Sequence, residues 1–324
     1  GISTAEQKQS FERLLSRAGI ATSDLLHKKY SHADLPRAFL HFVKTTQEKF
    51  VDRSSVKERW QIDRPAWLEQ DQEGILNDVH GIGFLTEEKQ PSLKTSEVLC
   101  VFGATKPIMQ ARIKFAESLI QSKIIQPKFL VLLTGERYVT TEKDIDGPLS
   151  ELTVLAKQLG KGIDQLTEAD LMRDIFAQSS LFNKIESTVI DTPRGNLPRP
   201  TTETTVTDFI KWLTKHPSIK SVIFVSNQPY VRYQFTVVRE ILRQHSHAFE
   251  FEVVGAAYKI NNAKKAESLF RLIEALGSQM WAQTPWVLDN LHLKISNPDM
   301  RQEFIDLYKK QPLIFRHVEK LFEN

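Results

Sequence analysis

The sequence predicts an α/β protein with a doubly wound, mainly parallel five-stranded sheet and added helical segments at both termini. From Glu97 onward, short apolar runs alternate with helical stretches, which is the pattern of βαβ units. Small and charged residues follow four of the apolar runs. Because crossovers between parallel strands are almost always right-handed, a doubly wound sheet is the economical arrangement of these units.

The expected strands are short runs rich in β-branched and aromatic residues, with turns at their ends. They span residues 98–102, 129–133, 188–190, 222–225 and 251–254. Between and after them, apolar residues recur at the spacing of one helix face. These helices cover residues 108–120, 171–176, 206–213, 235–242 and 266–276. An extra amphipathic element over residues 149–159 interrupts the regular alternation.

The two ends of the chain are predicted to be helical. Residues 1–96 contain a helix that opens at Asp34 and another that opens at Asp63 and continues to Val79. Residues 278–324 contain helices that begin near Pro298 and after Pro312. Both ends carry apolar stripes and tryptophans that need a partner surface. We therefore expect three regions, 1–96, 97–277 and 278–324, with the two helical ends packed together.

Composition excludes several classes of protein. Forty-three basic residues against 40 acidic ones give a net charge of +3, so no nucleic-acid surface is expected. No apolar run approaches the roughly 20 residues that span a bilayer, which favours a soluble, cytoplasmic protein. The chain begins at Gly1, so the sequence leaves open whether a signal or an anchor precedes it. Cys100 lies in an apolar run and is expected to be an inert core thiol. No Cys-rich or HExxH spacing occurs, and we expect no metal site.

Candidate ligand-binding residues follow the predicted strands. Gly103 and Thr105 come between a strand and a helix, where backbone N–H groups and the helix dipole favour an anion. An ordinary strand-to-helix turn explains this pattern equally well. The second strand is followed by Gly135 and Arg137, and the fourth by Ser226 and Asn227, with Arg232 in the next helix. Thr201 and Glu203 open the preceding helix, where capping alone is the alternative explanation.

Read together, these motifs resemble the SanA/YdcF/ElyC-like family over about residues 97–257. This family is a bacterial Rossmann-like group that is associated with the cell envelope. The resemblance rests on Arg112, Gly135, Glu168, Ala169, Thr201, Glu203, Ser226 and Arg232. It implies a ligand site at the carboxyl ends of the strands. Because one branch of the family binds S-adenosylmethionine, the resemblance implies that cofactor as a candidate ligand.

The chain departs from the family pattern at three positions. Glu136 stands where the family has a second glycine, Thr204 where it has an asparagine, and Pro229 where it has a histidine. These departures put the activity of the site in question.

Two functional hypotheses follow. In the first, the crevice binds a small anionic or nucleotide-like ligand, with Arg112 and Arg232 as anion clamps. Glu168 and Glu203 then act as hydrogen-bond acceptors or as acid and base groups. In the second, the core is a catalytically degenerate scaffold whose added helices bind a partner protein. The sequence does not decide whether the protein is an enzyme.

Overall fold

The computed structural model describes residues 4–22, 31, 34–50, 62–84, 86–93, 95–197, 199–245, 249–290, 298–299, 302 and 305–306. The chain divides into two compact units. One comprises Gly1–Thr86 and Lys259–Asn324, and the other comprises Glu87–Tyr258. Among the described residues, no helix combines the length and the apolar composition needed to cross a membrane.

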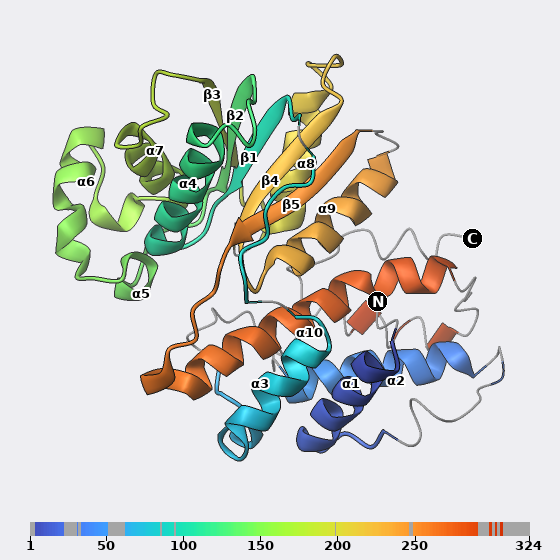
Figure 1. Ribbon diagram of the computed structural model, residues 1–324. Coiled ribbons are helices and arrows are strands. Elements are labelled where there is room, and N and C mark those ends of the chain that lie inside the picture. The colour runs from blue at the N-terminus through green and yellow to red at the C-terminus, as the bar shows by residue number, and fades with distance from the viewer. Residues whose placement is uncertain are drawn as a thin grey trace. The chain divides into compact units, whose positions relative to one another are not determined.

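The second unit contains a five-stranded, all-parallel sheet in the order β3-β2-β1-β4-β5 (Figure 1). This arrangement confirms the predicted fold class. Each predicted strand is present, and four of the five are longer than predicted. The strands are β1 (Val98–Phe102), β2 (Phe129–Gly135), β3 (Glu186–Thr192), β4 (Ser221–Asn227) and β5 (Glu250–Ala256).

Helices cover both faces of this sheet, and the central strands are therefore apolar on both sides. On one face, Leu99 and Val101 of β1 pack in a single core cluster with α4 (Lys106–Gln121) and α7 (Glu168–Ala177). The other face carries α8 (Thr202–Leu213) and α9 (Val231–His245). There the ring of Phe224 stacks on Phe102 and meets Phe209 edge-on, at centroid distances of 5.5 and 5.4 Å.

Four short elements lie between β2 and α7. The predicted amphipathic element over residues 149–159 is divided into two of them, because a 3₁₀ turn precedes the α-helix. The four are α5 (Glu142–Ile145), η4 (Leu149–Leu152), α6 (Thr153–Leu159) and η5 (Ile163–Gln165).

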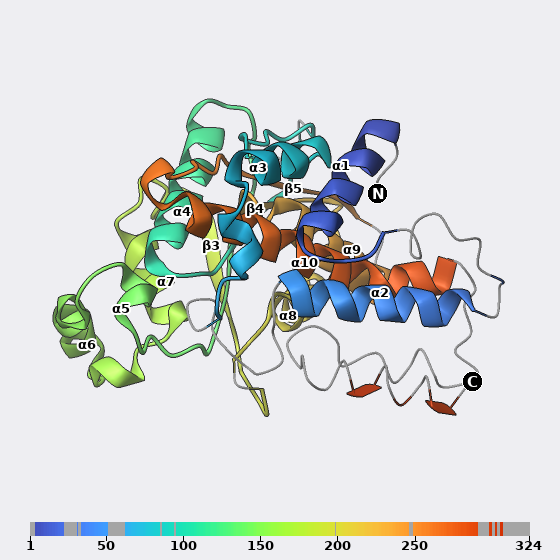
Figure 2. The same ribbon diagram turned by 90° about the horizontal axis from the view of Figure 1, so that it is seen from below.

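The first unit is helical. Its helices are α1 (Ala5–Arg17), α2 (Leu35–Phe50), η3 (Ala66–Glu69), α3 (Gln72–Gly81), η6 (Asn262–Lys264) and α10 (Lys265–Asn290). Figure 2 shows α2 beside α10, and Gln47 Nε2 donates a hydrogen bond of 2.9 Å to the carbonyl of Gly277 between them. The buried carboxylate of Asp78 in α3 accepts from Arg13 and Arg17 of α1 at 2.7 and 3.0 Å.

The structure divides the chain differently from the prediction. The expected boundary at residue 277 falls inside α10, which packs on α2 and α3. The single helix expected from Asp63 to Val79 is η3 followed by α3, because Asp71 begins a new helix by accepting from the amide of Gly74 at 3.0 Å. Most of residues 291–324 lie outside the described residues, including the helix expected after Pro312.

Candidate functional site

The predicted site lies where the order of the sheet reverses. The chain runs from β1 outward to β2 and β3, and then crosses to β4 on the other side of β1. In open α/β sheets, ligands bind outside the carboxyl ends of the strands at such a reversal. Gly103 follows β1, and Asn227 is the last residue of β4. Both predicted residues therefore lie at the reversal point.

Arg112 of α4 connects the two loops at this point. Its Nε and Nη2 donate to Asn227 Oδ1 at 3.0 and 2.7 Å. Its Nη1 donates to the carbonyls of Phe102 and Gly103 at 2.8 and 2.7 Å. The side chain is buried. All four hydrogen bonds have protein acceptors. Arg112 therefore positions the two loops, and its guanidinium is not directed at a bound anion.

Arg137, Glu168 and Asp144 form a buried charge network beside these loops. Arg137 follows β2, and its Nε donates to Glu168 Oε2 at 3.1 Å. Its Nη1 pairs with Asp144 Oδ1, and its Nη2 donates to the carbonyl of Ala104 at 3.4 Å. Asp144 also accepts from the amides of Thr140 and Thr141. One guanidinium thus joins the ends of β1 and β2 to the start of α7.

Gly103 makes room for the carboxylate of Glu168. A Cβ built on Gly103 would collide with Glu168 Oε1 and would lie 3.0 Å from the carbonyl oxygen of Leu133. Any larger residue at position 103 would push Glu168 away from Arg137. The glycine after β1 therefore permits close approach of a side chain from α7, which begins at Glu168.

The environment of Glu168 favours its neutral form. Burial raises the pKa of this carboxyl above its ordinary value, and the charges of Arg137, Arg199 and Arg112 oppose the increase without cancelling it. A buried carboxyl with a perturbed pKa at the carboxyl ends of the strands is a candidate acid or base group. Arg199, which the sequence analysis did not select, belongs to the same cluster of charges.

Gly135 permits a second close approach. A Cβ there would lie 2.5 Å from Pro200 Cγ and 3.0 Å from the carbonyl oxygen of Thr192. Thr192 pairs with Gly135 across β2 and β3. Its hydroxyl is buried and has no hydrogen-bond partner among the described residues.

Several predicted residues have local structural roles. The hydroxyl of Thr201 caps α8 by accepting from the amide of Thr204 at 3.2 Å, and Thr204 Oγ1 accepts in return from the amide of Thr201 at 2.9 Å. Thr204, at the family's asparagine position, is thus part of this cap. Glu203 is buried in the first turn of α8, and Ser226 is buried at the end of β4. Thr105 precedes α4, and its side chain does not cap that helix within the described residues.

Arg232 lies in the first turn of α9, and its charge helps to lower the pKa of Lys89. Lys89 was absent from the candidates because no local pattern distinguishes it. The pKa of Glu168, by contrast, is lowered by the charges of Arg137, Arg199 and Arg112, which oppose the effect of burial. The contacts described above bring together Gly103, Arg112, Arg137, Glu168 and Asn227.

Metal and thiol chemistry have little support in the described part of the chain. No group of three or more His, Cys, Asp or Glu side chains there could hold a metal ion. Asp144 is the buried partner of Arg137. Burial raises the pKa of the Cys100 thiol well above its ordinary value, which disfavours the nucleophilic thiolate.

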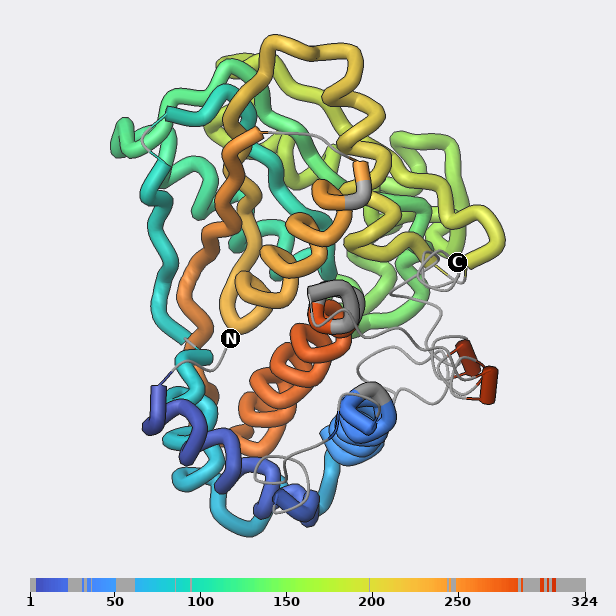
Figure 3. Tube along the Cα trace, turned by 90° about the vertical axis from the view of Figure 1, so that its right-hand side faces the viewer, coloured from blue at the N-terminus to red at the C-terminus, as the bar shows by residue number. Residues whose placement is uncertain are grey.

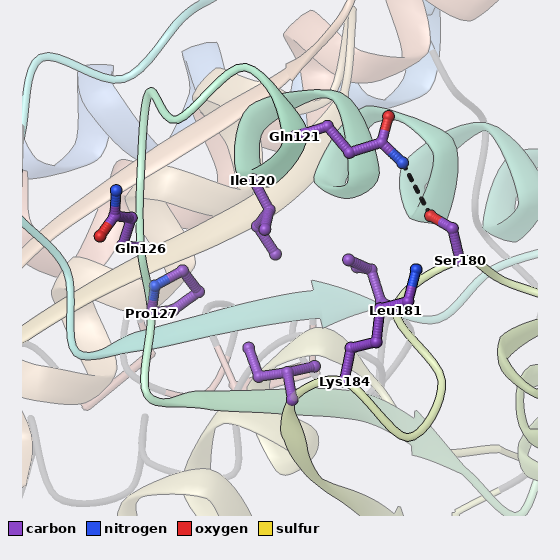
Figure 4. Close-up of a pocket in the computed structure, with 8 residues that line it drawn as sticks. Ile120, Gln121, Gln126, Pro127, Ser180, Leu181 and Lys184 are labelled. Atoms are coloured by element: carbon purple, nitrogen blue, oxygen red, sulfur yellow. Dashed lines mark hydrogen bonds between the residues drawn. The ribbon is translucent and has the colours of Figure 1, made fainter.

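A pocket of about 260 Å³ lies at the other end of the sheet (Figure 4). Gln126 and Pro127 precede β2, and Leu181 and Lys184 precede β3, so the pocket is at the amino ends of these strands. At its rim, Gln121 Nε2 donates to Ser180 Oγ at 2.8 Å. None of the predicted ligand-binding residues lines it.

Comparison with known proteins leaves the family untested. No family model matches the chain, and no curated protein matches it. The resemblance to the SanA/YdcF/ElyC-like family therefore stays a prediction.

Proposed function

We propose that the protein binds a small anionic or nucleotide-like ligand at the carboxyl ends of β1, β2 and β4, as a SanA/YdcF-like protein would. The observation that carries this proposal is the Glu168 carboxyl, which lies over Gly103 with its side chain 13% exposed and has a raised pKa despite its arginine neighbours. Such a group can share a proton with a ligand oxygen or nitrogen. S-adenosylmethionine is a candidate ligand on the family resemblance alone.

The arrangement supports a preorganised site. Arg137 holds Glu168 through Nε, and Arg112 holds the loops after β1 and β4. Side chains that are locked in this way lose little freedom when a ligand binds. The buried hydroxyl of Thr192 adds a polar group that a ligand or a water molecule would satisfy.

At a pH below the raised pKa of Glu168, replacing this residue with glutamine is expected to weaken ligand binding at least tenfold, or about 1.4 kcal/mol. Glutamine keeps the shape but cannot exchange the proton. The measurement is a thermal-shift screen of the full chain with nucleotides, S-adenosylmethionine and sugar phosphates, because a ligand that binds only the folded state raises its stability. The matched control is Glu186→Gln, an exposed glutamate at the amino end of β3.

A ligand that stabilises the wild type and Glu168→Gln equally would contradict the role of Glu168. The pH dependence provides a second check. An anionic ligand meets a neutral Glu168 below the raised pKa and a carboxylate above it, so its affinity should fall as the pH rises through that pKa. Glu168→Gln should lack this decrease.

The second candidate function is that of a scaffold that binds a partner protein. The observation in its favour is that the hydrogen bonds of Arg112 and Thr201 go to the protein itself. If no small molecule in the screen stabilises the protein, the scaffold hypothesis takes precedence.

A further inference from the structure

The two edges of the sheet differ. On the β5 edge, Lys89 forms an isolated antiparallel bridge with Gly255, in which its amide donates at 2.9 Å and its carbonyl accepts at 3.1 Å. The amide of Ser92 donates to the carboxylate of Glu252 on the same strand at 2.8 Å. Figure 3 shows the segment that precedes β1 running alongside β5. On the opposite edge, β3 pairs only with β2 among the described strands, so within the described part of the chain that edge is open.

Alternate residues of β3 direct their backbone groups toward this open edge. In a strand, the N–H and C=O of one residue point to one edge, and those of the next residue point to the other. The carbonyl of Thr192 accepts from the amide of Glu136 at 2.9 Å, so the even-numbered residues of β3 face β2. The odd-numbered ones therefore face outward, and no group of the described residues pairs with their amides or carbonyls. These residues are Ser187, Val189 and Asp191.

The outward side of β3 is accessible. Ser187 and Asp191 are exposed, and Val189 between them is half-buried and packs on the core. The flanking helices α7 and α8 contact β2 as well as β3, so they lie over the sheet instead of beyond its edge. The side chain of Asp191 is 38% exposed, and Arg173 contacts its Oδ2 at 3.4 Å, which leaves Oδ1 for another donor.

The outward residues are complementary to those of a second copy of the same strand. In an antiparallel pair about a two-fold axis at Val189, Ser187 lies opposite Asp191 of the partner subunit. Opposed outward residues exchange both of their backbone hydrogen bonds, and here the serine hydroxyl also donates to the aspartate carboxylate. A shift of two residues places Ser187 opposite Pro193, which has no N–H, or Asp191 opposite Ile185, which lies outside the strand. Only the central register pairs every outward residue.

The charges at the ends of β3 fit the same register. Glu186 lies opposite Thr192 of the partner subunit, so no two carboxylates face each other. Arg194 of the partner subunit follows two residues later, and diagonal neighbours at this spacing are within reach of long side chains. The guanidinium of Arg194 lies 5.6 Å over the ring of Tyr138, which holds it near this end of the sheet. A glutamate on one copy and an arginine on the other therefore attract each other at both ends of the paired strands.

We propose that two copies of the chain associate through their β3 strands, which pair antiparallel about a two-fold axis and join the two sheets into one. The strand meets itself, so the contact is closed and produces a dimer instead of a filament. Pairing also removes an exposed strand edge that would otherwise be a template for aggregation. The interface uses neither Glu168 nor the carboxyl ends of β1 and β4, so its outcome is separate from that of the ligand test.

The test is sedimentation velocity of the full chain over a range of concentrations. We expect a monomer–dimer equilibrium with a dissociation constant of about 1–100 µM, because strand pairing buries less surface than a standard interface. Ser187→Asp places two carboxylates opposite each other at both symmetric positions, and it should weaken dimerisation at least tenfold. The matched control is Ser150→Asp, which adds the same charge at an exposed serine of η4 and should dimerise as the wild type does.

An exchange of the two residues tests the register. Asp191→Ser alone removes a side-chain hydrogen bond from each symmetric pair and should weaken dimerisation about threefold. The double variant Ser187→Asp/Asp191→Ser puts an aspartate opposite a serine again, so it should dimerise within about threefold of the wild type. Within one chain the two positions are about 13 Å apart along the strand, so without a second copy their effects should add. Rescue by the double variant therefore reports a contact between two copies.

The proposal is overturned if the wild type stays monomeric above the expected dissociation constant, or if Ser187→Asp dimerises as tightly as Ser150→Asp does. A double variant that dimerises no better than Ser187→Asp would also overturn it. If Ser187→Asp fails to fold by circular dichroism, lysine at the same position decides the question. Ser187→Lys faces Asp191 of the partner subunit and should keep the dimer, whereas Ser187→Lys/Asp191→Lys should abolish it.

Discussion

Replacing Arg137 with methionine is expected to destabilise the protein by about 3–5 kcal/mol, because the substitution leaves the buried carboxylate of Asp144 without its cation and removes the hydrogen bond to Glu168. Arg137 pairs with Asp144 and Glu168, and all three side chains are nearly inaccessible to solvent. The measurement is urea unfolding followed by circular dichroism. The matched control is Arg173→Met, because Arg173 is 47% exposed and pairs with the exposed Asp191, while its second partner, the buried Asp170, keeps its ion pair with Lys161. Its loss should cost less than about 1 kcal/mol.

The same variant should change how stability depends on pH. The folded-state pKa of Glu168 is raised by burial, so its contribution to stability is fully present below the unfolded pKa of about 4.3 and is lost as the pH rises through the folded pKa. Arg137 opposes the increase, and its removal raises the folded pKa of Glu168 further. As the pH rises, the stability of Arg137→Met should therefore continue to fall up to a higher pH than the stability of the wild type does. Equal stability of the two proteins across this range would contradict the network.

Arg112→Met is expected to destabilise the protein by about 2–4 kcal/mol, because it leaves several acceptors at the reversal point without a donor. The carbonyls of Phe102 and Gly103 and the side chain of Asn227 all lose their hydrogen bonds to the guanidinium. Arg112→Lys should recover only part of this loss, since an ammonium cannot reproduce the fork.

A double-mutant cycle distinguishes this role from simple packing. Asn227→Ala and Arg112→Met should not be additive, with a coupling of about 0.5–3 kcal/mol for residues in direct contact. The measurement is urea unfolding of the two single variants and the double variant. Additive effects, or an Arg112→Met variant within about 0.5 kcal/mol of the wild type, would show that Arg112 does not hold the two loops together.

The sequence alone predicted the sheet. Strands that are buried on both faces of a parallel sheet read as apolar runs, and the run 98–102 coincides with β1. The strands were longer than predicted where the pairing extends past the apolar run. Gly135 and Asn227 belong to β2 and β4 because Thr192 and Ala256 pair with them. The sequence analysis placed Gly135, Ser226 and Asn227 in the turns that follow the strands, whereas the structure has them as the last residues of β2 and β4.

Only the tertiary structure decided which charges meet. The sequence did not reveal that Arg112 donates to Asn227 or that the charge of Arg232 lowers the pKa of Lys89. In the same way, Asp144 forms a buried ion pair with Arg137, and α10 packs on α2 and α3. Periodicity and capping depend on residues within a few positions of one another. The partner of a buried charge depends instead on strand order and on how distant loops fold back, which no local pattern encodes.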